Sequence, residues 1–237
     1  MTISVYSLRL VYTNGVFMST TIPIPNTQRF GIGTAALSGN STLQSLGDVL
    51  SGSSGGSGSF GGITGPDATN GVYLPMSTGT TNNSFIAHAG SRNWRGGRNC
   101  LYQCRLVLSG VSNIRVWLGL TDQSMANMRS DTPTGANIAA FLLSTASTKW
   151  QTVTANGGTF TTTASSQAPD TNNHTYEVSI NNGTGTVTYS IDGSSIGTNT
   201  TNLPSSSANL AMCVFLHCLT AANTQLNLHY YYNQADF

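Results

Sequence analysis

Residues 174–193 carry the clearest strand pattern in the sequence, HTYEVSINNGTGTVTYSIDG. Apolar or aromatic side chains alternate with polar ones twice within it, first from Tyr176 to Ile180 and again from Val187 to Ile191. A period of two residues is typical of strands that have one buried and one exposed face. The stretch therefore predicts two strands of an antiparallel meander.

Turn signals join these strands to each other and to the rest of the chain. Asn181 to Gly185 supplies a hairpin loop, and Asp192-Gly193 supplies a tight turn, because Asp and Gly tolerate positive φ values best. Further strands follow at the short spacing of a β-sandwich. We expect strands at about 72–75, 84–89, 100–109, 113–121, 138–144, 149–154, 158–164, 174–181, 185–192, 195–201, 209–219 and 225–232.

Charged side chains are scarce. Nine Lys and Arg and eight Asp and Glu make up 7% of the 237 residues, and Lys149 is the only lysine and Glu177 the only glutamate. Because Ser, Thr, Asn and Gly replace the charged helix formers, propensity as well as pattern favours an all-β protein. The net charge of +1 gives no long-range attraction to nucleic acid or to an anionic membrane, so neither is an expected partner.

Residues 1–70 differ from residues 71–237, and we expect them to form an extended arm on a sandwich domain. Ser51 to Pro66 is rich in Gly and Ser and would be a flexible linker in isolation. Such a tract is ordered when it docks, so we expect the arm to serve assembly on a partner. The alternative is that it folds back on its own sandwich. Residues 42–50 are compatible with one short helix.

The chain offers no sign of a membrane span or of a signal peptide. No run approaches 18 apolar residues, and Met1 to Phe17 contains Arg9 and no apolar block before a cleavage site. Synthesis in a cytoplasm is therefore expected. The cysteines at 100, 104, 213 and 218 lie in strand-like segments, where residues four apart are separated by about 13 Å, too far to share a metal. We expect buried, reduced thiols; the alternative is a cross-strand pair such as Cys104 with Cys213.

Three segments carry a resemblance to a known family. They are IRVWLGLTD (114–122), FLLST (141–145) with Trp150, and the stretch from His174 to Pro204. In this order and spacing they resemble the concanavalin-like, laminin-G-like jelly-roll domains of tailed-bacteriophage virion proteins, over roughly residues 70–237. The resemblance implies a two-sheet antiparallel jelly-roll sandwich on a phage particle, often as a homotrimer.

Catalytic and cofactor motifs are absent from the sequence. Glycan hydrolysis usually needs two carboxyl groups flanking the scissile bond, and no closely spaced pair of acids lies on a predicted strand. The four histidines are scattered, with no Gly-x-Ser-x-Gly elbow and no His-Glu-x-x-His helix. We therefore expect no catalytic residue, no bound metal, no cofactor and no enzymatic activity.

Candidate glycan contacts lie in and near the loop 122–137. Trp117 is either a core residue or an exposed stacking platform for a sugar. Asp122, Asn127 and Asp131 supply oxygen atoms that suit a sugar or calcium, although their spacing matches no known calcium loop, and turn formation explains them as well.

Candidate protein contacts lie in SRNWRGGRN (91–99), the only concentration of charge in the chain. Arg92, Trp94, Arg95 and Arg98 are of the residue types that interface hot spots favour. An ordinary surface loop is the alternative, because a single basic loop is a poor nucleic-acid site.

Together these features predict a non-enzymatic virion protein of a tailed phage, synthesised in the host bacterial cytoplasm. The first expectation is a decoration or cement protein that binds the major capsid protein on the outer head surface as a homotrimer. The alternative is a tail fibre or receptor-binding protein, in contact with tail or baseplate proteins, that recognises a host surface glycan.

Overall fold

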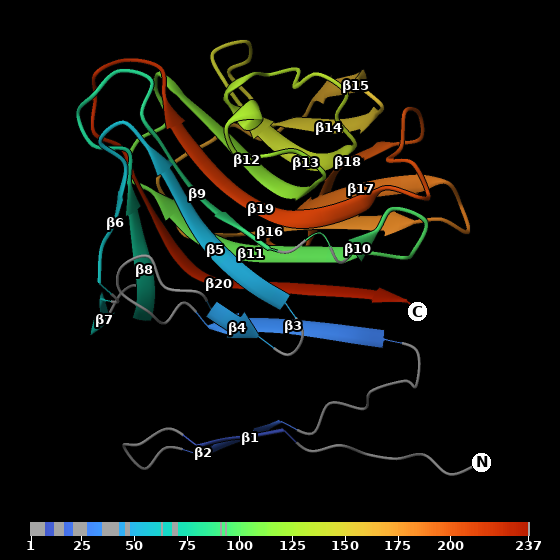
Figure 1. Cartoon of the computed structure of the whole chain (residues 1–237), viewed down its shortest axis with the longest axis horizontal. Helices are drawn as coiled ribbons and strands as arrows, with labels where there is room; N and C mark the ends of the chain where they lie inside the picture. Colours follow the sequence, from blue (N-terminus) through green and yellow to red (C-terminus); the bar gives the residue numbers. More distant parts are fainter. Residues whose placement is uncertain are drawn as a thin grey trace.

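The computed structural model describes residues 8–11, 17–20, 28–34, 43–45, 48–62, 64–67, 71–90, 92 and 94–236. Its architecture is two antiparallel sheets of nine strands each, accompanied by a hairpin of β1 (Leu8–Val11) and β2 (Phe17–Thr20) (Figure 1). Among the described residues the only helical element is a single 3-10 turn, Asn127–Arg129. The predicted all-β jelly-roll sandwich is confirmed.

One sheet, here called the β12 sheet, has the strand order β15-β14-β13-β12-β19-β9-β5-β4, and β10 pairs beside β19. Its strands are β4 (Leu43–Ser45), β5 (Asp48–Gly55), β9 (Phe85–Ala89), β10 (Trp94–Arg95), β12 (Ile114–Thr121), β13 (Ile138–Leu143), β14 (Gln151–Asn156), β15 (Thr159–Ala164) and β19 (Asn209–Cys218).

The opposing sheet, here called the β11 sheet, has the order β18-β17-β16-β11-β20-β8-β6, with β3 beside β20 and β7 beside β8. Its strands are β3 (Gln28–Thr34), β6 (Ser59–Phe60), β7 (Thr64–Asp67), β8 (Gly71–Ser77), β11 (Leu101–Leu108), β16 (His174–Asn181), β17 (Thr186–Ile191), β18 (Ser194–Asn199) and β20 (Gln225–Asp236).

Residues 174–193 form the predicted hairpin of β16 and β17. Tyr176 pairs with Ile191 and Ile180 with Val187, so the apolar residues of both strands share one buried face. Asp192 has φ 51° and Gly193 φ 77°, as the Asp-Gly turn requires. The alternation read from the sequence is therefore the alternation of the inner and outer faces of the β11 sheet.

The main core lies between the sheets and is rich in aromatic side chains. Phe141 packs edge-on against Tyr176 and Tyr189, with ring centroids 5.5 Å and 5.4 Å apart. Trp150 lies 5.0 Å from Tyr176. All of these side chains are buried. Offset and edge-on pairs add to the stabilisation that burial alone gives, so this cluster fixes how the two sheets stack.

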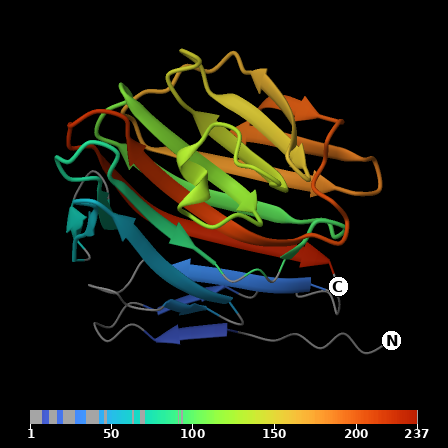
Figure 2. The same cartoon turned by 45° about the horizontal axis from the view of Figure 1, so that its top comes forward.

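A second hydrophobic cluster covers the outer face of the β12 sheet. Trp117 and Phe215 project to that face from β12 and β19, whereas their neighbours in sequence belong to the main core. Met125 and Met128, from the segment 122–137 that follows β12, pack on top of them. Figure 2 shows this yellow-green segment lying over the sheet. The sandwich thus carries a third layer made of its own chain, which we call the cover segment.

Part of the predicted arm belongs to the sheets. β5 pairs with β9 from Ser51↔Ala89 to Gly55↔Phe85, and β6 and β7 pair with β8. The Gly/Ser tract suits this position because Gly55 lies against the Phe85 ring. A Cβ added at Gly55 would stand only 2.4 Å from a carbon atom of that ring, so a larger residue would clash. The expected boundary at residue 70 therefore does not coincide with the edge of the sheets. Residues 1–7, 12–16, 21–27 and 35–42 of the arm lie outside the described residues.

Two smaller expectations are settled by the same structure. The described parts of 42–50 are strand, not helix, since Leu43–Ser45 pairs antiparallel with Asp48–Leu50. All four cysteines are buried and none forms a disulfide, which confirms the expectation of buried, reduced thiols. Within the described part of the chain no helix is long and apolar enough to cross a membrane.

Candidate functional site

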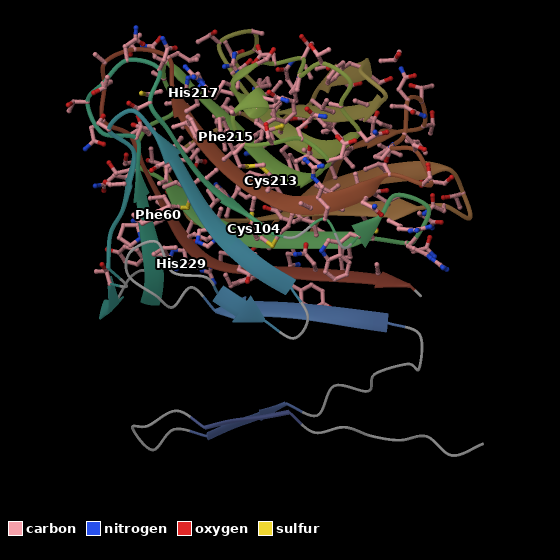
Figure 3. All side chains as sticks on the ribbon, in the orientation of Figure 1. Phe60, Cys104, Cys213, Phe215, His217 and His229 are labelled. Atoms are coloured by element: carbon pink, nitrogen blue, oxygen red, sulfur yellow. The ribbon has the colours of Figure 1, made fainter. Side chains whose placement is uncertain are left out.

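Trp117 is not an exposed platform for a sugar. Its side chain is 0% exposed and lies under the cover segment, and its Nε1 has no hydrogen-bond partner. Phe215 on β19, which is labelled in Figure 3, belongs to the same hydrophobic cluster. Of the two interpretations made from the sequence, the structure supports the first, a core residue. The expectation of a sugar contact at Trp117 is corrected accordingly.

Asp122 closes the base of the cover segment. Its carboxylate accepts hydrogen bonds from the backbone N–H of Asn137 (2.9 Å), from Asn137 Nδ2 (2.7 Å) and from Gln123 Nε2 (2.9 Å). Asn127 is exposed, and its amide donates to Gln123 Oε1 at 3.0 Å. Asp122 therefore serves the fold of the segment, as the turn interpretation predicted, and Asn127 makes a local hydrogen bond at its surface.

Asp131 holds the far side of the cover segment. One carboxylate oxygen accepts from Arg115 Nε at 2.5 Å, and the other accepts from Ser144 Oγ at 3.0 Å. Arg115 also donates to the carbonyl oxygen of Arg129, and its Nη1 lies 3.1 Å from His217 Nδ1. Asp122 and Asp131 are thus occupied by donors of the protein. In the part of the chain that is described, no three His, Cys, Asp or Glu side chains form a metal-binding group.

The arginine-rich loop separates into a buried and an exposed part. Trp94 is 4% exposed and packs in the main core from β10, so it is not available as a surface anchor. Arg92, Arg95 and Arg98 are exposed. The backbone N–H of Arg98 donates to the carbonyl of Arg95 (2.9 Å), which closes the turn. The three arginines remain candidate protein contacts, whereas Trp94 is corrected to a core residue.

A cleft of about 400 Å³ opens at the end of the sandwich where β12 begins and β13 ends. Its floor is formed by Ile114, Leu143 and Ser144, which are buried. Loops from three parts of the chain form its walls, and the remaining lining residues are Val111, Ser112, Asn113, Thr145, Ser147, Thr148, Ala168 and Pro169. The lining has hydroxyl, amide and aliphatic groups and no charged side chain.

Local hydrogen bonds fix the two walls that carry the hydroxyl and amide groups. Asn113 has φ 54°, a conformation that Asn tolerates, and its carbonyl accepts from the N–H of Leu219 at 2.8 Å. Ser144 Oγ accepts from the N–H of Ala146 (3.2 Å), and Ser147 Oγ from the N–H of Lys149 (3.0 Å). The side chains of Asn113 and Thr148 are exposed at the rim, where they can meet a ligand.

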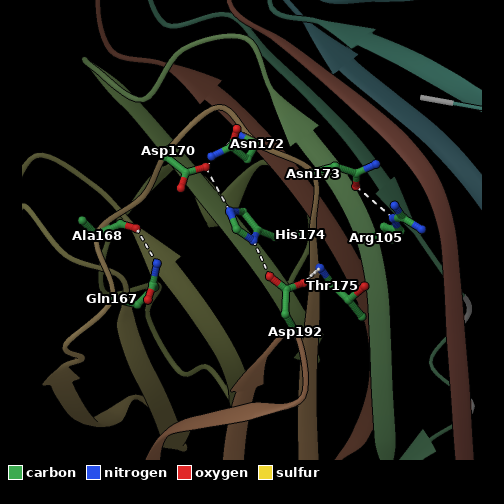
Figure 4. A network of polar contacts seen from close by, with 9 residues as sticks. All are labelled: Arg105, Gln167, Ala168, Asp170, Asn172, Asn173, His174, Thr175 and Asp192. Atoms are coloured by element: carbon green, nitrogen blue, oxygen red, sulfur yellow. Dashed lines mark hydrogen bonds and ion pairs between the residues drawn. The ribbon is translucent and has the colours of Figure 1, made fainter. Parts of the chain in front are cut away.

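The opposite wall belongs to the segment 165–173. Ser165 and Gln167 attach its start to Trp150, by backbone hydrogen bonds of 2.8 Å and 3.0 Å. Asp170, directly after the lining residue Pro169, lies 2.9 Å from Nε2 of His174. The other ring nitrogen of His174, Nδ1, lies 2.6 Å from Asp192 Oδ2 (Figure 4). We call these three side chains the Asp-His-Asp clamp.

The clamp shifts the titration of all three groups. Desolvation disfavours the charged imidazole of His174, but the hydrogen bonds and charges of Asp192 and Asp170 outweigh it and raise its pKa above 6.5. Desolvation also opposes the charged carboxylates, yet backbone donors and His174 lower the pKa of both Asp170 and Asp192 below 3.8. The clamp therefore favours the protonated ring, an imidazolium between two carboxylates, up to a higher pH than for a free histidine.

Two other histidines are buried and neutral. Burial lowers the pKa of His88 to about 4, and its Nδ1 has no hydrogen-bond partner. Burial, together with the positive charges of Arg115 and Arg129, lowers the pKa of His217 to about 4. Neither side chain reaches the cleft lining.

Comparison with known proteins identifies the fold rather than a family. No protein-family model matches the chain, and no curated protein matches it. Solved structures do match, at low identity. A protein of unknown function from Shewanella oneidensis MR-1 has a TM-score of 0.63 and 11% identity, covering 92% of this chain and 90% of that one.

Two further matches have names that mention carbohydrate. The Emp47p carbohydrate recognition domain has a TM-score of 0.53 and 7% identity, covering 78% of this chain and 89% of that one. The alginate lyase AlyC3 in complex with dimannuronate has a TM-score of 0.51 and 7% identity, covering 70% of this chain and 75% of that one. The chain therefore has the concanavalin-like jelly-roll fold that the sequence predicted. None of these matches is evidence for a phage virion family.

The expectation that the protein is not an enzyme is corrected by the same comparison. An alginate lyase has this sandwich fold, at only 7% identity. The absence of a closely spaced acid pair in the sequence therefore does not exclude catalysis, because residues distant in sequence can meet in a folded site. The clamp itself illustrates this, since Asp192 reaches His174 from the turn after β17, 18 residues further along the chain.

The residues of the cleft and the clamp were not identified from the sequence. Asn113, Ser144, Thr148 and Pro169 belong to ordinary polar loops, and no spacing between them marks a site. His174 had one usable signal. Because Tyr176 pairs with Ile191, the hairpin register places His174 and Asp192 at the same end of the two strands.

Proposed function

We propose that this protein recognises glycans and that the cleft beside the Asp-His-Asp clamp is its binding site. The observation that carries the proposal is the cleft lining, which combines hydroxyl and amide groups at the rim with an aliphatic floor. A sugar ring presents the complementary surface, with hydroxyl groups at its edge and C–H groups on its faces. Sites of this kind bind by a few placed polar groups within an apolar concavity. The fold shared with a carbohydrate recognition domain supports the proposal.

The lining also selects the charge of the glycan. No Lys, Arg, Asp or Glu side chain lines the cleft, so nothing there pairs with the carboxylate of an acidic sugar. Moving an unpaired carboxylate out of water is costly. The proposal is therefore for neutral glycans in preference to uronic-acid polymers such as alginate.

Blocking the cleft tests the proposal. Ala168 is exposed and lines the cleft, so Ala168→Tyr fills the cleft without disturbing the core. Ala126 is an exposed alanine of the cover segment, and Ala126→Tyr is the matched control. Wild-type protein is screened on an array of neutral and acidic oligosaccharides, and affinities are then measured by calorimetry with cellotetraose and dimannuronate as neutral and acidic references.

The expected result is retention of neutral glycans by the wild type and by Ala126→Tyr, with binding lost in Ala168→Tyr. Binding that survives in Ala168→Tyr would place the site elsewhere. An array on which wild-type protein retains no glycan would refute glycan recognition altogether.

For the biological setting we propose a tail fibre or receptor-binding protein of a tailed phage. Its support is the resemblance of the segments 114–122 and 174–204 to virion jelly-roll domains. Host surface glycan would then be the ligand, and tail or baseplate proteins the structural partners. Negative-stain imaging of phage particles with antibody against this protein tests the location, and absence from the particle would contradict it.

A head decoration or cement protein is the second candidate. The observation that favours it is the low charge of the chain, because 7% charged residues leaves few side chains to keep sheet edges apart, and closed association, such as a homotrimer, is a common remedy. Exposed Arg92, Arg95 and Arg98 would supply contacts with a neighbouring subunit or the major capsid protein. Labelling of the head rather than the tail, and a trimer in sedimentation, would favour this candidate.

A further inference from the structure

The Asp-His-Asp clamp connects one wall of the cleft to the β11 sheet. Asp170 directly follows Pro169 in the wall, whereas Asp192 lies in the turn after β17. Asp192 is fixed independently of His174, because its Oδ1 accepts from the N–H of Thr175 and its own N–H donates to the carbonyl of Thr175, both at 2.8 Å. His174 therefore ties the wall to a rigid point (Figure 4).

Only the protonated ring can make both bonds of the clamp. An imidazolium has two N–H donors, and each faces a carboxylate oxygen, at 2.9 Å and 2.6 Å. A neutral imidazole has one N–H, so one carboxylate would face a lone pair instead. Asp192 Oδ2 is the closer partner, at 2.6 Å, so we expect the neutral ring to keep its N–H on Nδ1, and the attachment that is lost is the one to Asp170.

The groups around the ring favour the protonated form. The two carboxylates are its only hydrogen-bond partners among the described residues. Arg105 on β11 is the nearby cation: it acts electrostatically on Asp192, and its Nε donates to Asn173 Oδ1 at 3.0 Å. On β20, His229 Nε2 lies 3.4 Å from the amide of Asn173, and on β16 the ring of Tyr176 lies 6.2 Å from His174. Two anions thus act against one nearby guanidinium.

Resting on the proposed function, we infer that His174 is a positioning residue of the glycan cleft, which as an imidazolium holds the Pro169–Asp170 wall in its binding position. Glycan binding is then strongest while His174 is charged and weakens as the ring loses its proton. The wall loses its attachment at Asp170 and keeps the one at Trp150. The cleft therefore opens on one side without unfolding of the sheets.

A ligand-free measurement tests the device directly. Hydrogen–deuterium exchange of residues 165–173 is followed from pH 5.5 to 9, as protection relative to the intrinsic exchange rate, while NMR follows the protonation of the His174 ring. We expect protection of the Asn172 amide, which donates to Asp170 Oδ1 at 2.7 Å, to fall about tenfold as His174 deprotonates, which corresponds to loss of one charge-assisted bond. Protection that does not change across the titration would overturn the inference.

Two carboxylate variants separate positioning from simple stability. Asp170→Asn and Asp192→Asn each remove one of the two negative charges that flank His174, but only Asp170 is part of the wall. We expect Asp170→Asn to reduce protection at 165–173 at every pH, because its neutral amide oxygen accepts from the ring more weakly than the carboxylate does. Asp192→Asn should keep protection at low pH and lose it at a lower pH than wild type does. Equal behaviour of the two variants would show that His174 has only a general stabilising role.

Binding supplies the second readout. In wild type, affinity for cellotetraose should fall about five- to tenfold between pH 6 and pH 9, whereas His174→Gln should bind weakly and without this pH dependence. If no glycan binds at any pH while protection of 165–173 still follows the His174 titration, the proposed function fails and the positioning role stands. If cellotetraose binds with the same affinity throughout, with His174 shown by NMR to titrate, the positioning role fails and the proposed function stands.

Discussion

Asp122 and Asn137 join the two ends of the cover segment through three hydrogen bonds. The carboxylate of Asp122 accepts from both the backbone and the side-chain amide of Asn137, and the N–H of Asp122 donates to the carbonyl of Asn137 at 3.1 Å. Asn137 Oδ1 in turn accepts from the N–H of Ser205 at 3.0 Å. The excursion from Asp122 to Asn137 is thereby closed at its base, which keeps Met125 and Met128 over Trp117.

We predict that Asp122→Ala destabilises the protein by about 2–3 kcal/mol, because it leaves donors of Asn137 without their charged acceptor. The loss should appear as a lower midpoint of urea unfolding. Tryptophan emission of the folded variant should also shift to longer wavelength as water reaches Trp117.

Asn127→Ala is the control for this change. Asn127 lies on the same segment, but its side chain is exposed, and its amide donates a hydrogen bond to Gln123 Oε1 at the surface. Its loss should stay within about 0.5 kcal/mol, with unchanged emission. A similar destabilisation in both variants would mean that Asp122 has no special part in closing the segment.

The histidines give the protein an acid limit of stability. His88 has a pKa of about 4 in the folded protein, against 6.5 in the unfolded chain. Between these two pH values the unfolded state therefore binds a proton that the folded state does not bind. The stabilising contribution of the neutral, buried His88 to the free energy of unfolding is fully present above about pH 6.5. It is lost as pH falls toward 4, and the loss is about 3 kcal/mol at pH 4. Urea unfolding at pH 7 and at pH 4 should show this loss in wild type, and His88→Gln should show a smaller one.

His174 has the opposite sign and serves as the comparison. Its folded pKa is raised, so its contribution is fully present below pH 6.5 and is lost as pH rises through the folded value. His174→Gln should therefore cost stability at pH 5.5 and less at pH 9. If His88→Gln leaves the difference between pH 7 and pH 4 unchanged, burial of His88 is not the source of acid sensitivity.

Sequence patterning identified the sandwich but not every element of it. The strands of residues 71–237, apart from the two-residue β10, were found because inner and outer faces impose a period of two. In β19, residues 210–218 are buried on both faces. β5 was not predicted, because Gly and Ser have low strand propensity. Its position depends on Phe85 in the neighbouring strand β9, which only Gly55 leaves room for. The side of the sheet on which Trp117 lies was predictable; what covers it was not.

The cleft could not be predicted because it is made by loops that are distant in sequence. Val111, Ser144 and Pro169 come together only when β12 and β13 are paired and the segment 165–173 is folded against Trp150. The four residues proposed as glycan contacts were chosen for their chemistry, and three of them were already committed to the fold. Burial of Trp117 and pairing of Asp122 and Asp131 with donors of the protein depend on tertiary structure.

The arginine loop allows Trp94 and Arg95 to be compared as neighbours. Trp94 is buried in the main core, whereas Arg95 is exposed. Trp94→Ala should lose about 3–5 kcal/mol of unfolding free energy through the cavity that it creates. Arg95→Ala should change stability by no more than about 0.5 kcal/mol. Thermal or urea unfolding of the two variants checks both values, and a stable Trp94→Ala would contradict the buried placement.

The thiols should be unreactive in the folded protein. Burial raises the pKa of Cys104 to about 12 and also raises that of Cys213, and all four cysteines are at most 1% exposed. Because the thiolate is the reactive form, labelling by an aromatic disulfide reagent at pH 8 should be slow in native protein and complete for four thiols in urea. Rapid labelling of one thiol without denaturant would contradict the prediction.

Gly119, within the Trp-Leu-Gly-Leu sequence of β12, should not tolerate a side chain. It has φ 152°, and a Cβ there would stand 2.4 Å from the carbonyl oxygen of Ala139 and 2.6 Å from the Cα of Ala140. Both are backbone atoms of the paired strand β13, so relief requires the two strands to move apart. We predict that Gly119→Ala destabilises the protein by about 3 kcal/mol, measured by urea unfolding.

Gly110→Ala is the matched control, because no atom lies within 4 Å of the position of its Cβ and its φ is not positive. Alanine there restricts the unfolded chain, so stability should be unchanged or higher by up to about 1 kcal/mol. Separation of β12 from β13 in Gly119→Ala would also move Asp131, through Arg115 on β12 and Ser144 after β13. Gly119→Ala should therefore weaken glycan binding in the cleft in addition to stability. Wild-type stability in Gly119→Ala would show that the strands yield without cost and that glycine is not required at this position.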